Sequence, residues 1–303
     1  MTTTAPVLQA IKHRPMSKRQ RIGRVAWYVA VILISLVTVM PLIWTLSTSL
    51  KPAAEILGGY LSLIPQSPTI ANYVAVFTES PFARYLLNSF VLAIAGTATN
   101  LFFGSLGGYA LAKLHFTGRK AVFGVFLGSM MIPGIVTMIP SFIVLRYFPL
   151  AGGNDLFGQG GVGFINSYWA IILPGAAGAL AVFFMKQFFE SLPDEMGEAA
   201  RIDGAGEFRI FVQIYLPQVA AGLAILGIMT FQAGWNSFLW PLIVLNTPEM
   251  LTVQVGLASF IGDHTTNFGP LMAGTIVSSL PVLVIFAFAQ RYIVQGVSFT
   301  SSK

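Results

Sequence analysis

The stretch that decides the fold is EAARIDGAGEFRIFVQIYLP, residues 198–217, which lies between two apolar runs of membrane-spanning length. Its charged side chains are Glu198, Arg201, Asp203, Glu207 and Arg209. In a chain that is 55% apolar and only 9% charged, an amphipathic insert is the expected place for contact with a soluble partner. From the spacing alone, an ordinary solvated loop between two spans is the favoured interpretation, because amphipathic loops are common.

Local signals predict two short helices around one turn. Ser191 precedes Asp194 by three residues, which is the arrangement of a capping box, so we predict a helix start there. Gly204 is a stop signal, because glycine takes the left-handed C-cap conformation without a Cβ clash. A second helix is expected from about Gly206, and Pro217 is expected to end it.

The composition indicates an all-α polytopic membrane protein. A typical soluble domain is about 25% charged, and this chain of 303 residues has too little polar surface for a soluble fold. Helical spans need about 20 mostly apolar residues. We predict six transmembrane helices, at residues 25–49, 86–111, 121–145, 168–188, 219–245 and 271–290.

The distribution of basic residues predicts the orientation. Fourteen lysines and arginines fall on the side that holds both chain ends and residues 198–217, and three fall on the other side. Because cytoplasmic loops carry the basic excess, the N and C termini are predicted to be cytoplasmic. The net charge of +6 is therefore a topology signal and indicates no nucleic-acid partner. Residues 1–24 form a cytoplasmic basic tail in this interpretation.

The predicted spans carry no ionisable residue near the middle of the membrane. Ion-coupled transporters need such groups, and the chain also has no G-x-x-x-x-G-K-[ST] sequence to hold ATP phosphates. Any energy for transport must then come from a partner. The histidines His13, His115 and His264 are scattered, so we predict no metal site, no cofactor and no catalytic residues in this chain.

Polar and aromatic residues in the fifth predicted span are candidates for a substrate pathway. Gln232, Asn236 and Trp240 recur every four residues and share one helical face, with Trp235 beside it. Amides can pair with sugar hydroxyls and indole rings can stack on sugar faces, but hydrogen bonding between helices would use the same residues. Weaker candidates in the second span are Asn88 and Asn100.

The 198–217 segment resembles the EAA loop of importer permeases of the ATP-binding-cassette (ABC) superfamily. The pattern E-A-A, three residues, G, nine residues, I-x-L-P is met without a gap at Glu198, Ala199, Ala200, Gly204, Ile214, Leu216 and Pro217. From about residue 45 onward the chain is also similar to the carbohydrate, maltose-type branch, specifically its smaller six-span subunit. Further short matches are Ser49-Leu50-Lys51-Pro52, Leu86-Leu87-Asn88-Ser89, Trp235-Asn236 and Phe238-Leu239-Trp240-Pro241.

The resemblance implies a type I ABC importer permease fold over residues 25–303, with a coupling loop at 190–217 and a cytoplasmic tail at 291–303. It implies half of a translocation pathway for a sugar or oligosaccharide. The implied partners are a second permease, an ATPase dimer and an extracytoplasmic binding protein. The family favours a paralogue as the second permease. The ATPase dimer binds ATP and Mg²⁺, and the binding protein meets the 246–270 loop. The implied location is the bacterial or archaeal cytoplasmic membrane. Residues implied to contact the ATPase are Glu198, Ala199, Ala200, Asp203, Gly204, Phe208, Ile214, Leu216 and Pro217.

Other classes of protein account for less of the sequence. A self-sufficient secondary transporter or channel explains six spans but neither the 198–217 segment nor the uncharged spans. A membrane enzyme would need a cluster of reactive side chains on one side of the membrane. The chain also departs from the family pattern: Ser237 follows Trp-Asn where an acidic residue is frequent, and the end from Ser298 to Lys303 lacks the usual glycine.

Overall fold

The computed structural model describes residues 18–58, 62–262 and 266–300, and this part of the chain is helical apart from connections and one bridge between Ile261 and Thr266. The long helices are α1 (Lys18–Ser49), α4 (Phe82–Lys113), α12 (Ala220–Trp235) and α15 (Phe268–Thr300). The helices of the third and fourth predicted spans are α5 (Arg119–Met130), α6 (Gly134–Arg146), α7 (Trp169–Gly175) and α8 (Ala179–Glu190). Short helices at the opposite end from α9 are α2 (Ala53–Leu57), α3 (Ala71–Thr78), α13 (Leu239–Val244) and α14 (Val253–Ala258), with a 3₁₀ turn at Pro248–Met250.

Three helical stretches are long and apolar enough to cross a membrane singly: Arg21–Ser49, Phe82–Lys113 and Phe268–Phe288. Three pairs of helices reach that length only together, across a bend, so the described chain has up to six spans. The predicted number of spans is therefore compatible with the structure. Not all of them are continuous helices.

The third and fourth predicted spans are each broken. Helices α5 and α6 meet at 106°, and Pro133 stands at the break, where it offers no backbone N–H to continue the helix. Helices α7 and α8 meet at 42°. The side-chain amide of Asn100 on α4 donates a 2.7 Å hydrogen bond to the Gly175 carbonyl at that break. A buried polar side chain thus satisfies a backbone group that the bend releases.

The fifth predicted span, 219–245, is also interrupted. Helix α12 ends at Trp235, residues 236–238 lie outside helices, and α13 begins at Leu239. The predicted stripe of Gln232, Asn236 and Trp240 therefore does not lie on one continuous helical face. Preceding α12, the stretch Glu207–Gln218 meets it at 82°, so Pro217 lies just before a sharp turn into the bundle.

Helix α4 packs closely on α8 through glycines. A Cβ atom on Gly104 would lie 2.7 Å from the Cβ of Ala181, and one on Gly108 would lie 2.7 Å from the Cβ of Met185. The small residues let the two helix backbones approach, as the small-xxx-small spacing of Gly104 and Gly108 suggests. Because α8 leads directly into residues 195–218, this packing also positions the polar segment.

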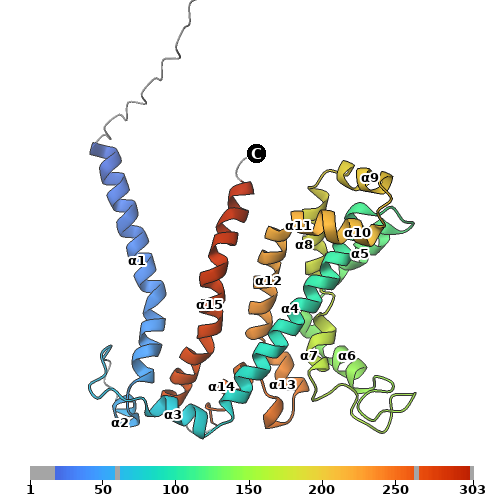
Figure 1. The fold of residues 1–303 in the computed structure, drawn as a ribbon. Helices are drawn as coiled ribbons and strands as arrows, with labels where there is room; N and C mark the ends of the chain where they lie inside the picture. Colours follow the sequence, from blue (N-terminus) through green and yellow to red (C-terminus); the bar gives the residue numbers. More distant parts are fainter. Residues whose placement is uncertain (1–17, 59–61, 263–265, 301–303) are drawn as a thin grey trace, which may run out of the picture.

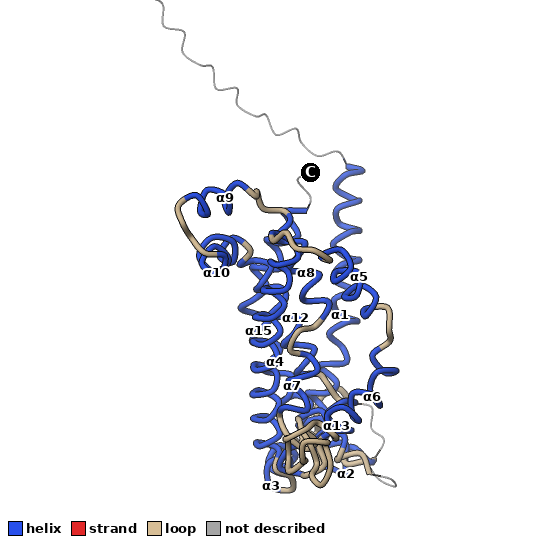
Figure 2. The backbone as a smooth tube through the Cα atoms, turned by 90° about the vertical axis from the view of Figure 1, so that its right-hand side faces the viewer, coloured by secondary structure: helices blue, strands red, loops and turns tan. Residues whose placement is uncertain are grey.

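Both ends of the described chain lie at the same end of the bundle as the polar segment. Figure 1 shows the start of α1, the end of α15 and α9 (Glu195–Ile202) at that end, with α2 and α3 at the other. Following the basic-residue distribution, we name it the cytoplasmic end. Figure 2 shows α9 and α10 (Glu207–Ile210) projecting to one side there.

The predicted terminal tails are only partly described. Most of the 1–24 tail lies outside the described residues, and α1 already begins at Lys18 within it. The predicted 291–303 tail continues α15 as far as Thr300, and residues 301–303 lie outside the described residues.

Candidate functional site

The polar segment folds as two helical pieces around one turn, as predicted. Helix α9 is followed by α10, a π-helical turn at Phe211–Tyr215 and α11 (Leu216–Gln218). Gly204 has φ +81°, the left-handed conformation that glycine adopts at low cost. We name residues 195–218 the cytoplasmic segment.

The predicted capping box at the start of α9 is wrong. The Ser191 hydroxyl donates 2.7 Å to the Phe188 carbonyl, so it belongs to the end of α8. Asp194 occupies the N-cap position without a side-chain cap hydrogen bond. Its carboxylate is engaged by Lys113 of α4 instead, because tertiary structure brings a buried ammonium to this point.

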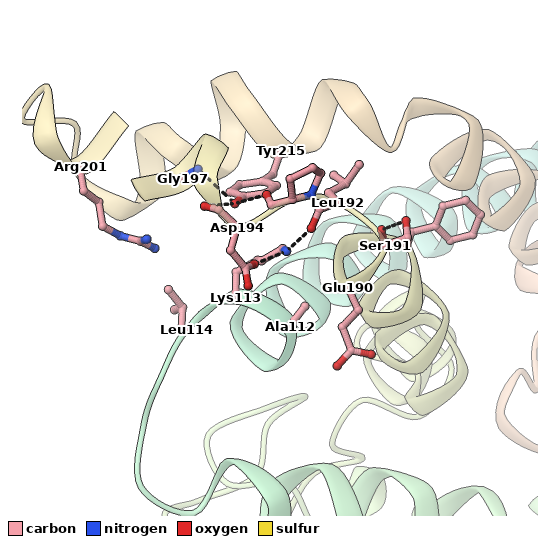
Figure 3. A network of polar contacts seen from close by, with 12 residues as sticks. Ala112, Lys113, Leu114, Glu190, Ser191, Leu192, Asp194, Gly197, Arg201 and Tyr215 are labelled. Atoms are coloured by element: carbon pink, nitrogen blue, oxygen red, sulfur yellow. Dashed lines mark hydrogen bonds and ion pairs between the residues drawn. The ribbon is translucent and has the colours of Figure 1, made fainter. Parts of the chain in front are cut away.

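Lys113 fastens the start of the cytoplasmic segment to the bundle (Figure 3). Its ammonium donates 2.6 Å to the Leu192 carbonyl and pairs with the Asp194 carboxylate at 2.5 Å. It also lies 5.3 Å from the centre of the Tyr215 ring. The hydrogen bond from Lys113 lowers the pKa of Asp194, so this carboxylate is charged at neutral pH.

Tyr215 fastens α9 from the other side. The Gly197 N–H donates 3.2 Å to the Tyr215 hydroxyl, which donates in turn to the Pro193 carbonyl at 3.2 Å. A Cβ on Gly197 would lie 2.8 Å from that hydroxyl oxygen. The close approach therefore requires glycine at this position, and α9 is held by a buried aromatic side chain.

Glu207 joins both helical pieces to α4. Its carboxylate accepts two hydrogen bonds from the Arg201 guanidinium, at 2.6 and 3.2 Å, and one from the Tyr109 hydroxyl at 2.9 Å. The Arg201 hydrogen bonds are the largest cause of a lowered pKa for Glu207, and the same bonds raise the pKa of Arg201. Two-point pairing of this kind fixes geometry as well as charge.

The residues implied to contact an ATPase divide between an exposed and a buried side. Ala200 is 8% exposed, and Ile214 and Leu216 pack on the same apolar cluster as Tyr215. The other implied contact residues are exposed: Glu198, Ala199, Asp203, Gly204, Phe208 and Pro217. Phe208, at 66% exposed, is a large apolar side chain that the described residues cover only in part, with the Phe211 ring 6.2 Å away.

Sequence reasoning missed several residues of this site, among them Ile202, Lys113 and Tyr215. Ile202 is 86% exposed and is a second large, exposed apolar side chain of the segment. An apolar residue ending an otherwise polar helix was the available signal for it. Lys113 and Tyr215 gave no local signal for their roles, because their partners are 79 and 18 residues away in sequence.

Two of the candidate pathway residues present unshielded side chains. Gln232 near the end of α12 and Asn236 just after it are exposed. The Asn236 side-chain oxygen lies 3.5 Å from the side-chain nitrogen of Gln254 on α14. Gln254, which sequence reasoning did not select, thus lies with Asn236 at the interruption of the fifth span. We name the side chains of Gln232, Asn236 and Gln254 the amide group.

The other candidates already have protein partners for their polar atoms. Asn88 is fully buried, donates to the carbonyls of Glu249 and Leu251, and accepts from a tyrosine hydroxyl. Trp235 is 2% exposed and donates to the Ser278 carbonyl at 3.0 Å. Trp240 donates to the carbonyl of Ala170, and Asn100 bridges the α7–α8 break described above. Direct substrate contact for Asn88, Asn100 and Trp235 has no support in this conformation.

Charged groups buried in the described part of the chain are Lys51, Lys113 and Lys186. Each lies within the last two turns of a helix or just after a helix, away from the middle of a span. The described residues hold no group of three side chains of the kinds that ligate a metal. The arrangement thus presents an exposed protrusion at the cytoplasmic end and exposed amide side chains at the interruption of the fifth span.

Comparison with known proteins identifies the class. The model of the family "binding-protein-dependent transport system inner membrane component" matches residues 101–299. The chain belongs to this family of membrane permease subunits, which are not enzymes themselves. An arabinooligosaccharides transport system permease protein of Bacillus subtilis is 35% identical over 95% of this chain and 98% of its own. A lactose transport system permease protein of Rhizobium radiobacter is 30% identical over 92% and 96%, respectively.

Solved structures show the same fold. A chain of a bacterial ABC transporter involved in the import of the acidic polysaccharide alginate superposes with a TM-score of 0.79 at 24% identity, covering 92% of this chain and 99% of that chain. A second structure of the alginate transporter, in complex with an alginate pentasaccharide-bound periplasmic protein, has a TM-score of 0.63 at 17% identity. The protein therefore has the fold of an ABC importer permease and lies in the inner membrane.

Proposed function

We propose that this chain is the permease subunit of an ATP-driven sugar importer and forms half of its translocation pathway. A second permease, a paralogue of this chain, would complete the pathway. An ATPase dimer would supply the energy, and an extracytoplasmic binding protein would deliver the sugar. The main observation in support of this proposal is the cytoplasmic segment, an exposed protrusion that Lys113, Tyr215 and Glu207 hold against the bundle. The names of the relatives support a sugar or oligosaccharide as the cargo.

The cytoplasmic segment supports the coupling role through its two sides. Its inner side packs on α4 and α8 through Ala200 and Tyr215, so force applied to the segment reaches the spans. Its exposed surface includes Ile202 and Phe208, and exposed apolar side chains of this size mark interaction surfaces. An ATPase that binds ATP and Mg²⁺ is the partner that the EAA resemblance implies for this surface.

The pathway role rests on the amide group formed by Gln232, Asn236 and Gln254. Amides donate and accept hydrogen bonds without a charge, which suits a hydroxyl-rich neutral cargo. The group lies where the fifth span is interrupted, and non-helical backbone at membrane depth is tolerated where it lines a cavity or is buried in protein. Trp240 stands in the same region, with its indole N–H bound to Ala170.

A self-sufficient secondary transporter or channel is the alternative. It would need ionisable groups within the spans for ion coupling, whereas the buried lysines of the described residues lie near helix ends. It would also leave the rigid cytoplasmic segment without a role. Transport by this chain alone in vesicles, driven by an ion gradient without nucleotide hydrolysis, would favour this alternative.

The coupling proposal is tested by co-purification of the complete transporter. Ile202→Ser and Phe208→Ser remove exposed apolar groups, so we expect less ATPase retained and slower ATP-dependent uptake. Ile22→Ser is the matched control, because Ile22 is 70% exposed at the cytoplasmic end of α1, outside the segment. Retention of the ATPase at the wild-type level in both segment variants would remove this surface from the contact.

The pathway proposal is tested by uptake with the ATPase complex intact. Gln232→Ala and Asn236→Ala should lower sugar uptake while the ATPase still co-purifies, because neither side chain is buried. Gln66→Ala is the control, since Gln66 is an exposed amide on the connection between α2 and α3, outside the fifth span and outside the 246–270 loop. Unchanged uptake in both pathway variants would argue against substrate contact by this amide group.

A further inference from the structure

A hollow at the cytoplasmic end has no role in the function proposed above. It has a volume of about 890 Å³ and lies between the α4–α5 connection, the start of α5 and the last turns of α8. We name it the basic hollow. Its lining residues are His115, Phe116, Thr117, Gly118, Arg119, Lys120, Phe123, Lys186 and Glu190.

The charges around the basic hollow do not balance. Glu190 is its one carboxylate and pairs with Lys186 at 2.5 Å and more distantly with Arg119 at 3.9 Å. Lys120 is exposed and makes no ion pair within the described part of the chain. With three cations against one carboxylate, the hollow has an excess of positive charge even when His115 is neutral.

The start of α5 adds to this excess. Arg119 and Lys120 are its first residues, and its first turn contains no acidic residue. Helix N-termini carry partial positive charge, so cations there are unfavourable unless an anion is close by. The Arg119 guanidinium already donates to the carbonyls of Leu114 and Ala112, at 3.2 and 3.1 Å. An anion in the hollow would therefore act chiefly on Lys120, where it would relieve the repulsion and the excess of side-chain charge together.

The walls of the hollow also suit a membrane-surface ligand. Phe116 is 43% exposed, and the Lys186 ammonium lies 4.3 Å from the centre of the Phe123 ring. Apolar rings therefore stand beside the cations, at the cytoplasmic end of helices that enter the membrane. The cytoplasmic leaflet carries anionic lipids that attract basic groups at this depth.

We propose that the basic hollow binds a phosphate-ester anion, presented by the headgroup of an anionic phospholipid. Lys120 contributes the ion pair to the phosphate, and Arg119 and Lys186 add to the local potential while holding Glu190. The same chemistry would recognise soluble phosphate, so the experiment separates the two sources. The inference does not depend on the cargo or on the ATPase contact.

The test uses the full chain in detergent, with native mass spectrometry of bound lipid. Phosphatidylglycerol should bind more tightly than phosphatidylcholine with the same acyl chains. Lys120→Gln should weaken phosphatidylglycerol binding about fivefold, the effect expected of one basic residue near an anionic surface. Lys18→Gln is the control, because it removes the same charge from the exposed start of α1, outside the hollow.

The outcomes separate clearly. Selective loss of phosphatidylglycerol in Lys120→Gln, with no change in Lys18→Gln, supports the lipid site. Competition by millimolar inorganic phosphate, lost in the same variant, identifies a phosphate site that is open to soluble ligands. Equal binding of the two lipids without phosphate competition, or equal effects of the two substitutions, overturns the proposal.

Discussion

Replacing Lys113 by methionine tests how the cytoplasmic segment is fastened to the bundle. The substitution keeps an unbranched side chain in a position that is 8% exposed but removes the ammonium. The Leu192 carbonyl then loses its 2.6 Å hydrogen bond, and Asp194 loses its ion pair. We expect the start of the segment to detach from α4 more often while the spans stay folded.

The size of the effect follows from the two lost contacts. A hydrogen bond from a charged group contributes about 1.5–3 kcal/mol. The Asp194 side chain is 73% exposed, so its ion pair adds only about 0.2–1 kcal/mol. Together these contacts amount to about 2–4 kcal/mol, or a change of roughly 30-fold to several-hundred-fold in the local opening equilibrium.

Hydrogen exchange of the amides in α9, measured on the full chain in nanodiscs, gives the readout. Lys113→Met should speed exchange there by the factor above. Asp194→Asn should speed it about fivefold or less, because the bond from Lys113 to the Leu192 carbonyl remains. Equal exchange in the two variants, or protection at the wild-type level in Lys113→Met, would refute this account of the attachment.

Further substitutions and conditions test other parts of the structure. Gly204→Ala should destabilise the turn by about 1–2 kcal/mol, because its φ is positive; unchanged exchange of the following amides would contradict that strain. Asn88→Ala should lower the unfolding temperature, because the fully buried Asn88 amide makes three hydrogen bonds that alanine cannot make. Asn236→Ala, at an exposed position, should leave the unfolding temperature unchanged. Equal unfolding temperatures for the two variants would contradict a stabilising role of the Asn88 hydrogen bonds. Hydrogen bonding lowers the folded-state pKa values of Asp194 and Glu207. The stability that these carboxylates give to the attached segment is therefore complete above their ordinary pKa values of 3.8 and 4.5, and it is lost as pH falls below them. Exchange in α9 should therefore accelerate in acid, and a pH-independent opening equilibrium would argue against these ion pairs.

Several elements of the fold could be predicted because their causes are local in sequence. The apolar runs, the basic-residue distribution and the Gly204 turn each depend on neighbouring residues. The close packing at Gly104 and Gly108 follows from their spacing on one helical face. The bends were less predictable: Pro133 permits a break, but an angle of 106° depends on what the two helices pack against.

The candidate site shows the same division. The pattern of residues 198–217 was enough to select the cytoplasmic segment, and the amides of the fifth span were visible as a stripe. Which of the selected side chains remain accessible was not predictable. Asn88 and Trp235 have the same hydrogen-bonding chemistry whether they face a pathway or a backbone carbonyl, and the sequence carries no record of that choice.

The sequence by itself determined the membrane class, the orientation, the family and the position of the protruding segment, because hydropathy, charge and motif spacing are properties of the chain before it folds. Only the tertiary structure decided which side of that segment is exposed and which residues hold it. Lys113, Tyr109 and Tyr215 act across distances of 18 to 98 residues in sequence. Such contacts arise when helices pack, and their energies depend on burial and geometry that no local pattern contains.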